Sequence, residues 1–146
     1  MPIRCELISQ DRIVFQGDVD IVILPGSAGE LGILPHHAPL LTTLDYGIIK
    51  VRQGEREQVF AVAGGLAEIL PDNVTILADA AENAEEIDVV RAEAAKKRAE
   101  TALASVALPE PDKLFAEAAL RRSTLRLDVV KRHRKAPPLT ERDISM

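Results

Sequence analysis

Residues 26–49 constrain the fold of this chain more than any other stretch, because turn-forming residues interrupt them every few positions. Their sequence, GSAGELGILPHHAPLLTTLDYGII, contains four of the eight glycines, Pro35 and Pro39, and two of the three histidines. Glycine adopts the positive φ angles of tight turns without steric cost, and proline stiffens the loop between two turns. The apolar runs between these residues are too short for helices. The stretch therefore predicts short strands joined by tight turns.

The same pattern of short apolar runs and turn signals extends over residues 1–78. Residues 3–7 alternate apolar and polar side chains, as does a strand with one buried face. Residues 52–56 predict a hairpin loop, and Gly64–Gly65 predict a bulge or corner that bends a strand. Pro71–Asn73 predict a turn before the last strand. Many short strands at regular spacing indicate a β-sandwich or a flattened barrel.

From Asp88 onward the apolar period changes to 3.6 residues, which indicates helices. Asp88 is the predicted N-cap of a first helix, and Pro109–Pro111 predict its end. Asp112 is predicted to cap a second helix that fades near Lys135, because Pro137–Pro138 cannot continue it. A short proline loop between two helices predicts an antiparallel hairpin. The predicted stripes are Ala92, Ala95, Ala99, Ala102 and Val106 on the first helix, and Phe115, Ala118, Arg122, Leu125 and Val129 on the second.

The predicted fold class is therefore α+β, with an N-terminal β-sandwich followed by a C-terminal antiparallel two-helix hairpin. The stripe of the first helix consists mainly of alanine, and each buried methyl-sized group contributes only about 0.8 kcal/mol. Ordering each residue of the hairpin costs about 1–2 kcal/mol. We therefore expect the hairpin to be weakly docked and movable.

Charge is distributed unevenly along the chain, whose net charge is −5. Residues 1–112 contain nine Lys and Arg against nineteen Asp and Glu, a local charge of −10. Residues 113–135 contain eight against two, a local charge of +6. A basic segment on an acidic body predicts a partner with negative charge. Nucleic acid is a poor candidate, because the four aromatic residues are scattered and form no stacking platform.

Several other functions are disfavoured by the sequence. No run of 18 apolar residues occurs, so we expect no direct membrane insertion. The first residues do not form a charged segment followed by an apolar one, so we expect no export. The single cysteine, Cys5, fits a small core residue in a reducing compartment. His36, His37 and the distant His133 are too few for a metal site, and no nucleophile–base pair suggests a catalytic residue.

The arginines of the two predicted helices form a candidate anion site. Asp88, Arg91 and Arg98 share one face of the first helix, and Arg122 and Arg126 share one face of the second. In an antiparallel hairpin these faces can converge, and guanidinium groups bind phosphates through paired hydrogen bonds. On spacing alone, a solvated charged face on which Asp88 is only a helix cap is the more common arrangement.

Three motifs together resemble the epsilon subunit of F-type ATP synthases. They are GELGILPHHAPLLT, VAGGLAEILPDNVTILADAAE and IDVVRA, in the order and at the spacing of that family, and the likeness spans about residues 3–131. The resemblance implies a sandwich of about ten strands over residues 1–84, which docks on stalk and ring. It implies a two-helix regulatory domain over residues 85–135, after which residues 136–146 form a tail that we expect to be flexible.

The resemblance also implies a function. An epsilon subunit of the bacterial type is a non-catalytic rotor subunit of the central stalk, coupling ring rotation to the catalytic head of a proton-translocating synthase. It is peripheral, on the cytoplasmic face of the inner (plasma) membrane. The implied partners are the gamma subunit, the polar loops of the membrane c-ring and, when the hairpin is extended, the catalytic alpha and beta subunits.

The IDVVRA motif resembles the family's ATP-binding pattern, so the resemblance implies ATP as a regulatory ligand and no required cofactor. There is no glycine-rich phosphate loop, so hydrolysis by this chain is not suggested. The residues implied around the phosphates are Arg91, Arg98, Arg122 and Arg126, and those implied around adenosine are Glu82, Ile87, Asp88 and Ala92.

Two further groups are implied as interfaces. Glu30 and His37 correspond to positions at the foot of the sandwich that face the ring loops and the stalk. Arg132, Arg134 and Lys135 form a basic helix end that would meet an acidic loop on the catalytic subunits and block rotation. The alternative for that end is a set of cations stabilised by the helix dipole. A free-standing ATP or polyanion sensor remains the alternative function, and an enzyme is the weakest hypothesis.

Overall fold

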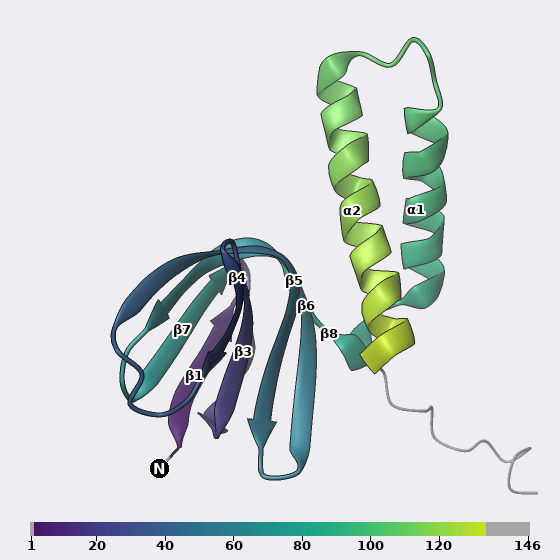
Figure 1. Cartoon of the computed structure of the whole chain (residues 1–146). Helices are drawn as coiled ribbons and strands as arrows, with labels where there is room; N and C mark the ends of the chain where they lie inside the picture. The colour runs from purple at the N-terminus through teal and green to yellow at the C-terminus, as the bar shows by residue number, and fades with distance from the viewer. Residues whose placement is uncertain (1, 134–146) are drawn as a thin grey trace, which may run out of the picture.

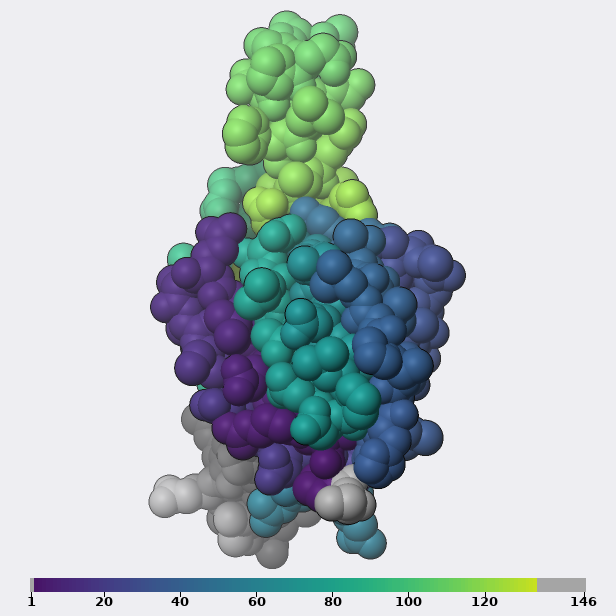
Figure 2. All heavy atoms as spheres, turned by 90° about the vertical axis from the view of Figure 1, so that its left-hand side faces the viewer, coloured from purple at the N-terminus to yellow at the C-terminus, as the bar shows by residue number. Residues whose placement is uncertain are grey.

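The computed structural model describes residues 2–133 and consists of a β-sandwich from which a long helical hairpin projects (Figure 1). Viewed from the sandwich side, the hairpin rises beyond the sandwich as a narrow column (Figure 2). The predicted fold class, an α+β chain with sandwich first and hairpin second, is therefore confirmed. Arg134, Lys135 and the tail of residues 136–146 lie outside the described residues.

The sandwich is built from one antiparallel-rich sheet that folds over on itself. Its strands are hydrogen-bonded in the order β2-β1-β7-β6-β5-β3-β4, with β8 added on β6, and β1 runs parallel to β7. The strands are β1 (Ile3–Ile8), β2 (Ile13–Val19), β3 (Ile21–Gly26), β4 (Gly29–Ile33), β5 (Leu40–Gln53), β6 (Arg56–Ile69), β7 (Asn73–Ala78) and β8 (Ala81–Asn83).

The strands β5 and β6, each 14 residues long, are shared by both layers. Residues 65–69 of β6 pair with β7, whereas residues 60–62 pair with β8. The chain bends between these halves at Gly64 and Gly65, whose φ angles are +86° and +144°. A Cβ on Gly65 would lie 2.4 Å from the carbonyl oxygen of Leu77. The predicted corner is confirmed, and the described residues contain eight strands because two long strands replace several short ones.

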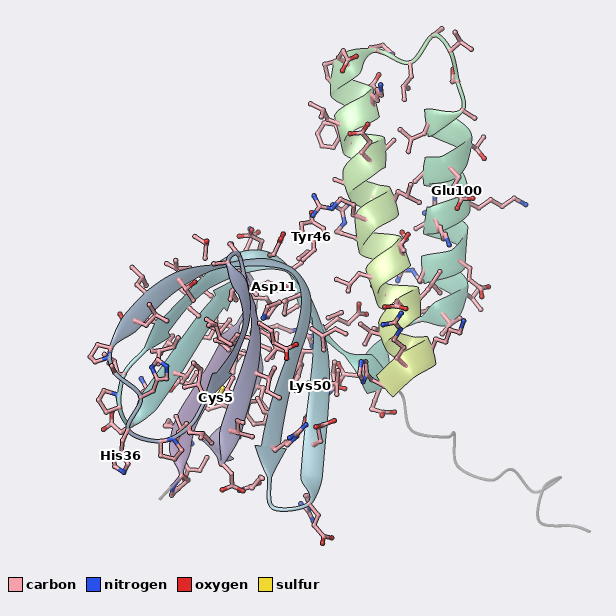
Figure 3. All side chains as sticks on the ribbon, viewed as in Figure 1. Cys5, Asp11, His36, Tyr46, Lys50 and Glu100 are labelled. Atoms are coloured by element: carbon pink, nitrogen blue, oxygen red, sulfur yellow. The ribbon has the colours of Figure 1, made fainter. Side chains whose placement is uncertain are left out.

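The core lies between the two layers and is made of large apolar side chains from seven strands. In β1 the alternation predicted from sequence places Ile3, Cys5 and Leu7 inside. Phe60 is fully buried, and its ring centroid lies 5.8 Å from that of Phe15. Burial raises the pKa of the Cys5 thiol to about 12, so this cysteine, seen inside the sandwich in Figure 3, is an inert core residue.

A short 3-10 turn, η1 (Ala84–Glu86), leads from the sandwich to the helices α1 (Val89–Leu103) and α2 (Glu110–His133). Asp88 is the N-cap of α1, as predicted, and its Oδ1 accepts a hydrogen bond of 3.1 Å from the backbone amide of Arg91. The prediction that Asp112 caps the second helix is wrong. That helix begins at Glu110, before Pro111, because proline is accepted in the first helical turn, where its missing amide costs no hydrogen bond.

The predicted helix stripes need a second correction. Val106 lies in the loop between the helices and is fully exposed, since α1 ends three residues earlier. On α2 the predicted stripe does not form the seam with α1. Its upper members Phe115 and Arg122 are exposed, whereas Leu125 and Val129 pack on the sandwich.

The residues that face the first helix are smaller than predicted. Ala92 and Ala99 are the buried residues of α1, and Ser123 is buried on α2. The Ser123 hydroxyl donates a hydrogen bond of 2.7 Å to the carbonyl of Ala119, so its burial leaves no polar group unpaired. The contact between the helices is therefore thin.

The base of the hairpin is attached to the sandwich by a separate apolar cluster. Fully buried Val129 of α2 packs there with Ile87 and with side chains of η1 and β6. The cluster, called the basal cluster below, consists of Val59, Ala61, Ala84, Ile87 and Val129, with Ile48, Leu125 and Val130 partly buried against it.

Candidate functional site

A cleft of about 570 Å³ lies between the two helices and the adjoining edge of the sandwich. It falls within the size range of small-molecule sites. Four arginines reach it from different places, two from α1 and two from α2, together with one carboxylate from β8. The charged residues that line it are Arg91, Arg98, Arg122, Arg126 and Glu82, and the others are Ala80, Ala94, Ala95, Ala119 and Ser123.

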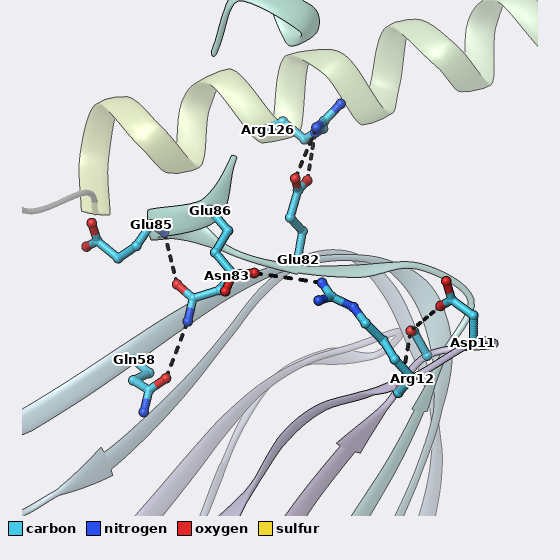
Figure 4. A network of polar contacts seen from close by, with 9 residues as sticks. Asp11, Arg12, Gln58, Glu82, Asn83, Glu85, Glu86 and Arg126 are labelled. Atoms are coloured by element: carbon cyan, nitrogen blue, oxygen red, sulfur yellow. Dashed lines mark hydrogen bonds and ion pairs between the residues drawn. The ribbon is translucent and has the colours of Figure 1, made fainter. Parts of the chain in front are cut away.

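One wall of the cleft is an ion pair between the sandwich and α2. The guanidinium of Arg126 donates two hydrogen bonds to the carboxylate of Glu82, from Nε over 2.8 Å and from Nη2 over 3.1 Å (Figure 4). Both side chains are mostly buried, with exposed fractions of 29% and 27%. Such a paired, partly desolvated contact is stronger than an exposed one. It ties α2 to the sandwich beside the arginines of the cleft.

The other three arginines of the cleft are available for a ligand. Within residues 2–133, the side chains of Arg91, Arg98 and Arg122 make no ion pair. Four guanidinium groups against one carboxylate give the cleft a strong positive potential. The alanines between them leave room for a ligand and offer no competing negative charge. The cleft is therefore suited to a polyanion such as a chain of phosphates.

The remaining residues predicted to bind nucleotide do not line the cleft. Ile87 and Ala92 are buried in the packing at the base of α1, with exposed fractions of 3% and 0%. Asp88 is exposed, and one of its oxygens is engaged in capping α1. The structure thus brings together five of the eight predicted residues, all of them charged, and places the other three where the motif starts the first helix.

The cleft continues into a second hollow that the sequence did not indicate. This hollow has a volume of about 490 Å³, shares Glu82, Arg122 and Arg126 with the cleft, and extends to the turn between β1 and β2. From that turn Arg12 approaches Glu86 of η1, with 3.8 Å between Nη2 and Oε2 (Figure 4). No local pattern reveals such contacts, because they join residues more than 70 positions apart.

Another contact missed from the sequence lies higher on α2. The guanidinium carbon of Arg121 lies 4.1 Å from the centroid of the Tyr46 ring, and Nη2 lies 3.8 Å from Oδ1 of Asp45. Tyr46 is the single tyrosine of the chain, and in Figure 3 it lies between the sandwich and α2. This contact joins α2 to β5 outside the cleft.

The predicted interface residues of the sandwich are both accessible. Glu30 is exposed on β4, beside the turn that follows β3. His37 is partly exposed in the loop that leads into β5, and its Nδ1 lies 2.7 Å from the carbonyl oxygen of Ala38. The preceding His36 has a φ of +67°, a left-handed conformation that is unusual for a residue other than glycine. Figure 3 places His36 at the end of the sandwich away from the helices.

The predicted basic segment around Arg132 lies only partly within the described residues. Arg132 lies in the last turn of α2 and is exposed, and its Nε lies 3.0 Å from Oδ1 of Asp128. Cations in the last turn of a helix interact favourably with its dipole. Within residues 2–133, no helix is long and apolar enough to cross a membrane, and no three metal-ligating side chains come together.

Both parts of the chain match models of one protein family. The beta-sandwich domain of the ATP synthase Delta/Epsilon chain matches residues 2–84, and the long alpha-helix domain of the same chain matches residues 85–131. The ATP synthase epsilon chain of Dehalococcoides mccartyi is 46% identical over 135 residues, which cover 92% of this chain and 96% of that one. That of Syntrophobacter fumaroxidans is 47% identical over 133 residues, which cover 89% and 96%.

Solved structures agree with these matches. A chain of the Euglena gracilis mitochondrial ATP synthase, in a structure of OSCP, F1 and c-ring, superposes with a TM-score of 0.76 at 25% identity, covering 88% of this chain and 81% of that one. A chain from the central stalk and c-ring of the Tetrahymena thermophila enzyme shares the fold, with a TM-score of 0.55 at 12% identity, covering 89% and 97%. The sandwich, the hairpin and the matches over both show that this chain belongs to the family of ATP synthase epsilon chains.

Proposed function

We propose that this protein is a non-catalytic rotor subunit in the central stalk of a proton-translocating F-type ATP synthase. It couples rotation of the membrane ring to the catalytic head, peripheral on the cytoplasmic face of the inner membrane. The observation that carries this proposal is the match of both domains to epsilon chains over nearly the whole length of the relatives. Its partners are the gamma subunit and the polar loops of the c-ring, with Glu30 and His37 as contact residues.

The test is assembly with the other subunits of the synthase. Charge reversal in Glu30→Lys, combined with His37→Ala, is expected to weaken binding to gamma and the ring, because both side chains are accessible and neither is part of the core. Co-purification of gamma and ring subunits measures this. Glu55→Lys, an equally exposed acid in the loop between β5 and β6, is the matched control. Unchanged co-purification of the double variant would contradict the interface assignment.

We further propose that the four-arginine cleft binds ATP as a regulatory ligand that favours the docked hairpin. Arg91, Arg98, Arg122 and Arg126 repel one another, and a bound triphosphate would neutralise them. A ligand at 100 times its dissociation constant stabilises the state that binds it by about 2.7 kcal/mol. That is enough to shift a weakly held hairpin between two positions.

ATP binding is tested on the isolated chain by thermal melts with and without millimolar ATP. A rise in melting temperature is expected, and Arg91→Ala should abolish it. This variant is cleaner than Arg126→Ala, since Arg126 also neutralises Glu82, whereas the Arg91 side chain makes no ion pair within residues 2–133. Arg56→Ala, an exposed arginine on β6, is the control. An unshifted melt of the parent chain would remove ATP from the proposal.

The alternative function, a free-standing ATP or polyanion sensor, is favoured by the same cleft. Co-purification separates it from the rotor subunit, and a comparison of ligands shows whether ATP or any polyanion is bound. A sensor would not co-purify with a membrane-bound assembly. Tripolyphosphate lacks adenosine. If the cleft recognises only the negative charge of its ligand, tripolyphosphate should raise the melting temperature as much as ATP does.

We also propose that the basic residues 131–135 inhibit ATP hydrolysis when the hairpin is extended toward the catalytic alpha and beta subunits. Neutralising Arg132, Arg134 and Lys135 to glutamine is expected to raise hydrolysis by the assembled synthase at low ATP. The difference should shrink with added salt, because exposed charges are screened. Equal hydrolysis rates of parent and variant at low ATP and low salt would contradict this role.

A further inference from the structure

Two separate contacts hold α2 on the sandwich outside the arginine cleft. The lower one is the basal cluster around Val129. The upper one is the contact of Arg121 with Tyr46 and Asp45. The guanidinium carbon of Arg121 lies 4.1 Å from the Tyr46 ring centroid, and its Nη2 lies 3.8 Å from Oδ1 of Asp45. Arg121 and Val129 are eight residues apart, or about 12 Å along the helix. The basal cluster and the pair of Arg126 with Glu82 attach only the lower part of α2, whereas the upper contact adds an attachment that helps to fix the direction of the helix.

The sandwich side of the upper contact is firmly placed. Asp45 and Tyr46 lie on β5 at the level of the corner, where Tyr46 pairs with Ala63 and the next residue of β6 is Gly64. The backbone amide of Asp79 donates a 3.1 Å hydrogen bond to the Gly64 carbonyl. A Cβ added to Gly64 would lie only 2.9 Å from Oδ2 of Asp79. The small residues Ala63 and Gly64 therefore leave the Tyr46 ring accessible to α2. The hydrogen bond between Asp79 and Gly64 fixes this part of the sheet.

The chemistry of the contact suits a reversible attachment. A guanidinium over a tyrosine face is attracted by the ring and keeps part of its hydration. The carboxylate of Asp45 adds an ion pair, but both charged side chains are about 60% exposed. Exposed ion pairs are weak. The contact can thus form and break without leaving a buried charge unpaired, in contrast to the pair of Arg126 and Glu82.

The contact is also separate from the ligand site. Arg121 does not line the four-arginine cleft, although its neighbour Arg122 does. Arg121 precedes Arg122 directly, so its contact with the sandwich influences how Arg122 and Arg126 are positioned relative to Glu82. The contact therefore acts on the position of the hairpin and not on the ligand directly.

We propose that Arg121, Tyr46 and Asp45 form a latch that holds the hairpin on the sandwich in the absence of ligand. The latch sets the resting ratio of docked to undocked hairpin, on which any ligand in the cleft then acts. This inference deepens the proposed regulation and rests on it only for the consequence that undocking promotes inhibition. The latch itself is a property of the isolated chain.

The latch is tested by a distance measurement on the full chain without ATP. Labels are placed through Glu55→Cys on the sandwich and Glu117→Cys on α2, two exposed positions. The native Cys5 takes no label, because it is buried and burial raises the pKa of its thiol to about 12. Pulsed electron spin resonance or single-molecule energy transfer then reports the docked and undocked populations.

Arg121→Ala and Tyr46→Leu are each expected to lower the docked-to-undocked ratio about three- to tenfold. Arg121→Lys keeps the charge but loses the planar stack, so an intermediate ratio is expected. Lys113→Ala removes another exposed cation of α2, one that makes no ion pair within the described residues, and should leave the ratio unchanged. An unchanged ratio in Arg121→Ala, or a parent chain with no docked population, would overturn the proposal.

The double variant tests whether the two residues act through one contact. If they do, Arg121→Ala combined with Tyr46→Leu lowers the ratio no more than Arg121→Ala alone. Fully multiplicative effects would overturn the latch. Co-purification with gamma and ring subunits should be unaffected by Arg121→Ala, so failure of the latch and failure of the proposed rotor function give different results.

Discussion

The sandwich and the hairpin bury very different material. Between the layers of the sandwich lie fully buried side chains of phenylalanine, isoleucine, leucine and valine, among them Phe60, Ile3 and Leu24. Between α1 and α2 the buried residues are two alanines and one serine. Since hydrophobic stabilisation follows the apolar area buried, the sandwich is stable by its own core. The hairpin depends instead on what it touches at its base.

This difference separates two roles within one chain. A densely packed sandwich presents its surface residues in fixed positions, as a docking platform needs. A hairpin with a thin seam is attached by the basal cluster, by Arg126 on Glu82 and by Arg121 on Tyr46. Regions that move on binding are drawn from the least stable part of a protein. The following predictions test whether stability is divided in this way.

The largest effect is expected from the centre of the sandwich. Phe60→Ala removes a fully buried ring packed on Phe15 and should lower the free energy of unfolding by about 3–5 kcal/mol. Urea unfolding followed by circular dichroism measures this. Leu77→Ala removes a side chain that is 51% exposed on β7, so it serves as the control with a much smaller loss. Equal losses would mean that the sandwich core does not dominate stability.

A smaller and local effect is expected at the base of the hairpin. Val129→Ala should weaken the basal cluster by about 2 kcal/mol, which raises opening of the hairpin about thirtyfold. Hydrogen exchange should show faster amides in α1 and α2 and unchanged amides in β6. Val90→Ala, on an exposed position of α1, is the matched control. If β6 exchanged faster as well, hairpin and sandwich would form a single cooperative unit.

A small gain in stability is expected at the far end of the sandwich. His36 holds a φ of +67°, which costs a side-chain-bearing residue about 1–2 kcal/mol, whereas glycine costs more entropy in the unfolded chain. His36→Gly should therefore raise the free energy of unfolding by about 0.5 kcal/mol. His37→Gly relieves no such strain, so it should destabilise. A loss of stability in His36→Gly would show that the imidazole contributes more than its backbone costs.

A comparably small effect concerns pH. A hydrogen bond of 2.6 Å from Arg52 Nε lowers the pKa of the Glu57 carboxyl below its usual 4.5. The stabilisation is therefore present above pH 4.5 and is lost as the pH falls through the lower folded-state value. The pair is exposed, so it contributes less than about 1 kcal/mol. The stability difference between the parent and Glu57→Gln should vanish on acidification, and a difference that grew below pH 4 would contradict the assignment.

Local patterns were sufficient for much of the fold. The change of apolar period near Asp88, the capping aspartate itself and the corner at Gly64 were all predictable, because each depends on neighbours in sequence. The faces of α2 were not, since the predicted stripe assumed that helix pairs only with helix. In the structure Leu125 and Val129 pack against the sandwich, and small residues such as Ser123 lie in the contact between the two helices.

The candidate site divides in the same way. Helical spacing and an antiparallel turn allowed Arg91 and Arg98 to converge with Arg122 and Arg126, but a solvated charged face fitted the same spacing. The partner of Arg126 within the protein, Glu82, lies 44 residues away, and Arg121 meets Tyr46 across 75 positions. Contacts between a helix and a distant strand depend on how the whole hairpin is set on the sandwich, and no local pattern carries that information.

The parallel pairing of β1 with β7 has a consequence for how the chain is made. The first strand can pair with β2 as soon as that strand is made, but its second neighbour is available only after Asn73–Ala78 have left the ribosome, because Arg4 to Ile8 align with residues 73–77. Such distant pairings must close long loops, which slows folding, whereas helices joined by a short loop form from local contacts. During translation, the edge of β1 that pairs with β7 therefore stays unpaired until β7 has been made. The hairpin is synthesised after the sandwich strands and forms from local contacts, so it can dock on a sandwich that has already closed.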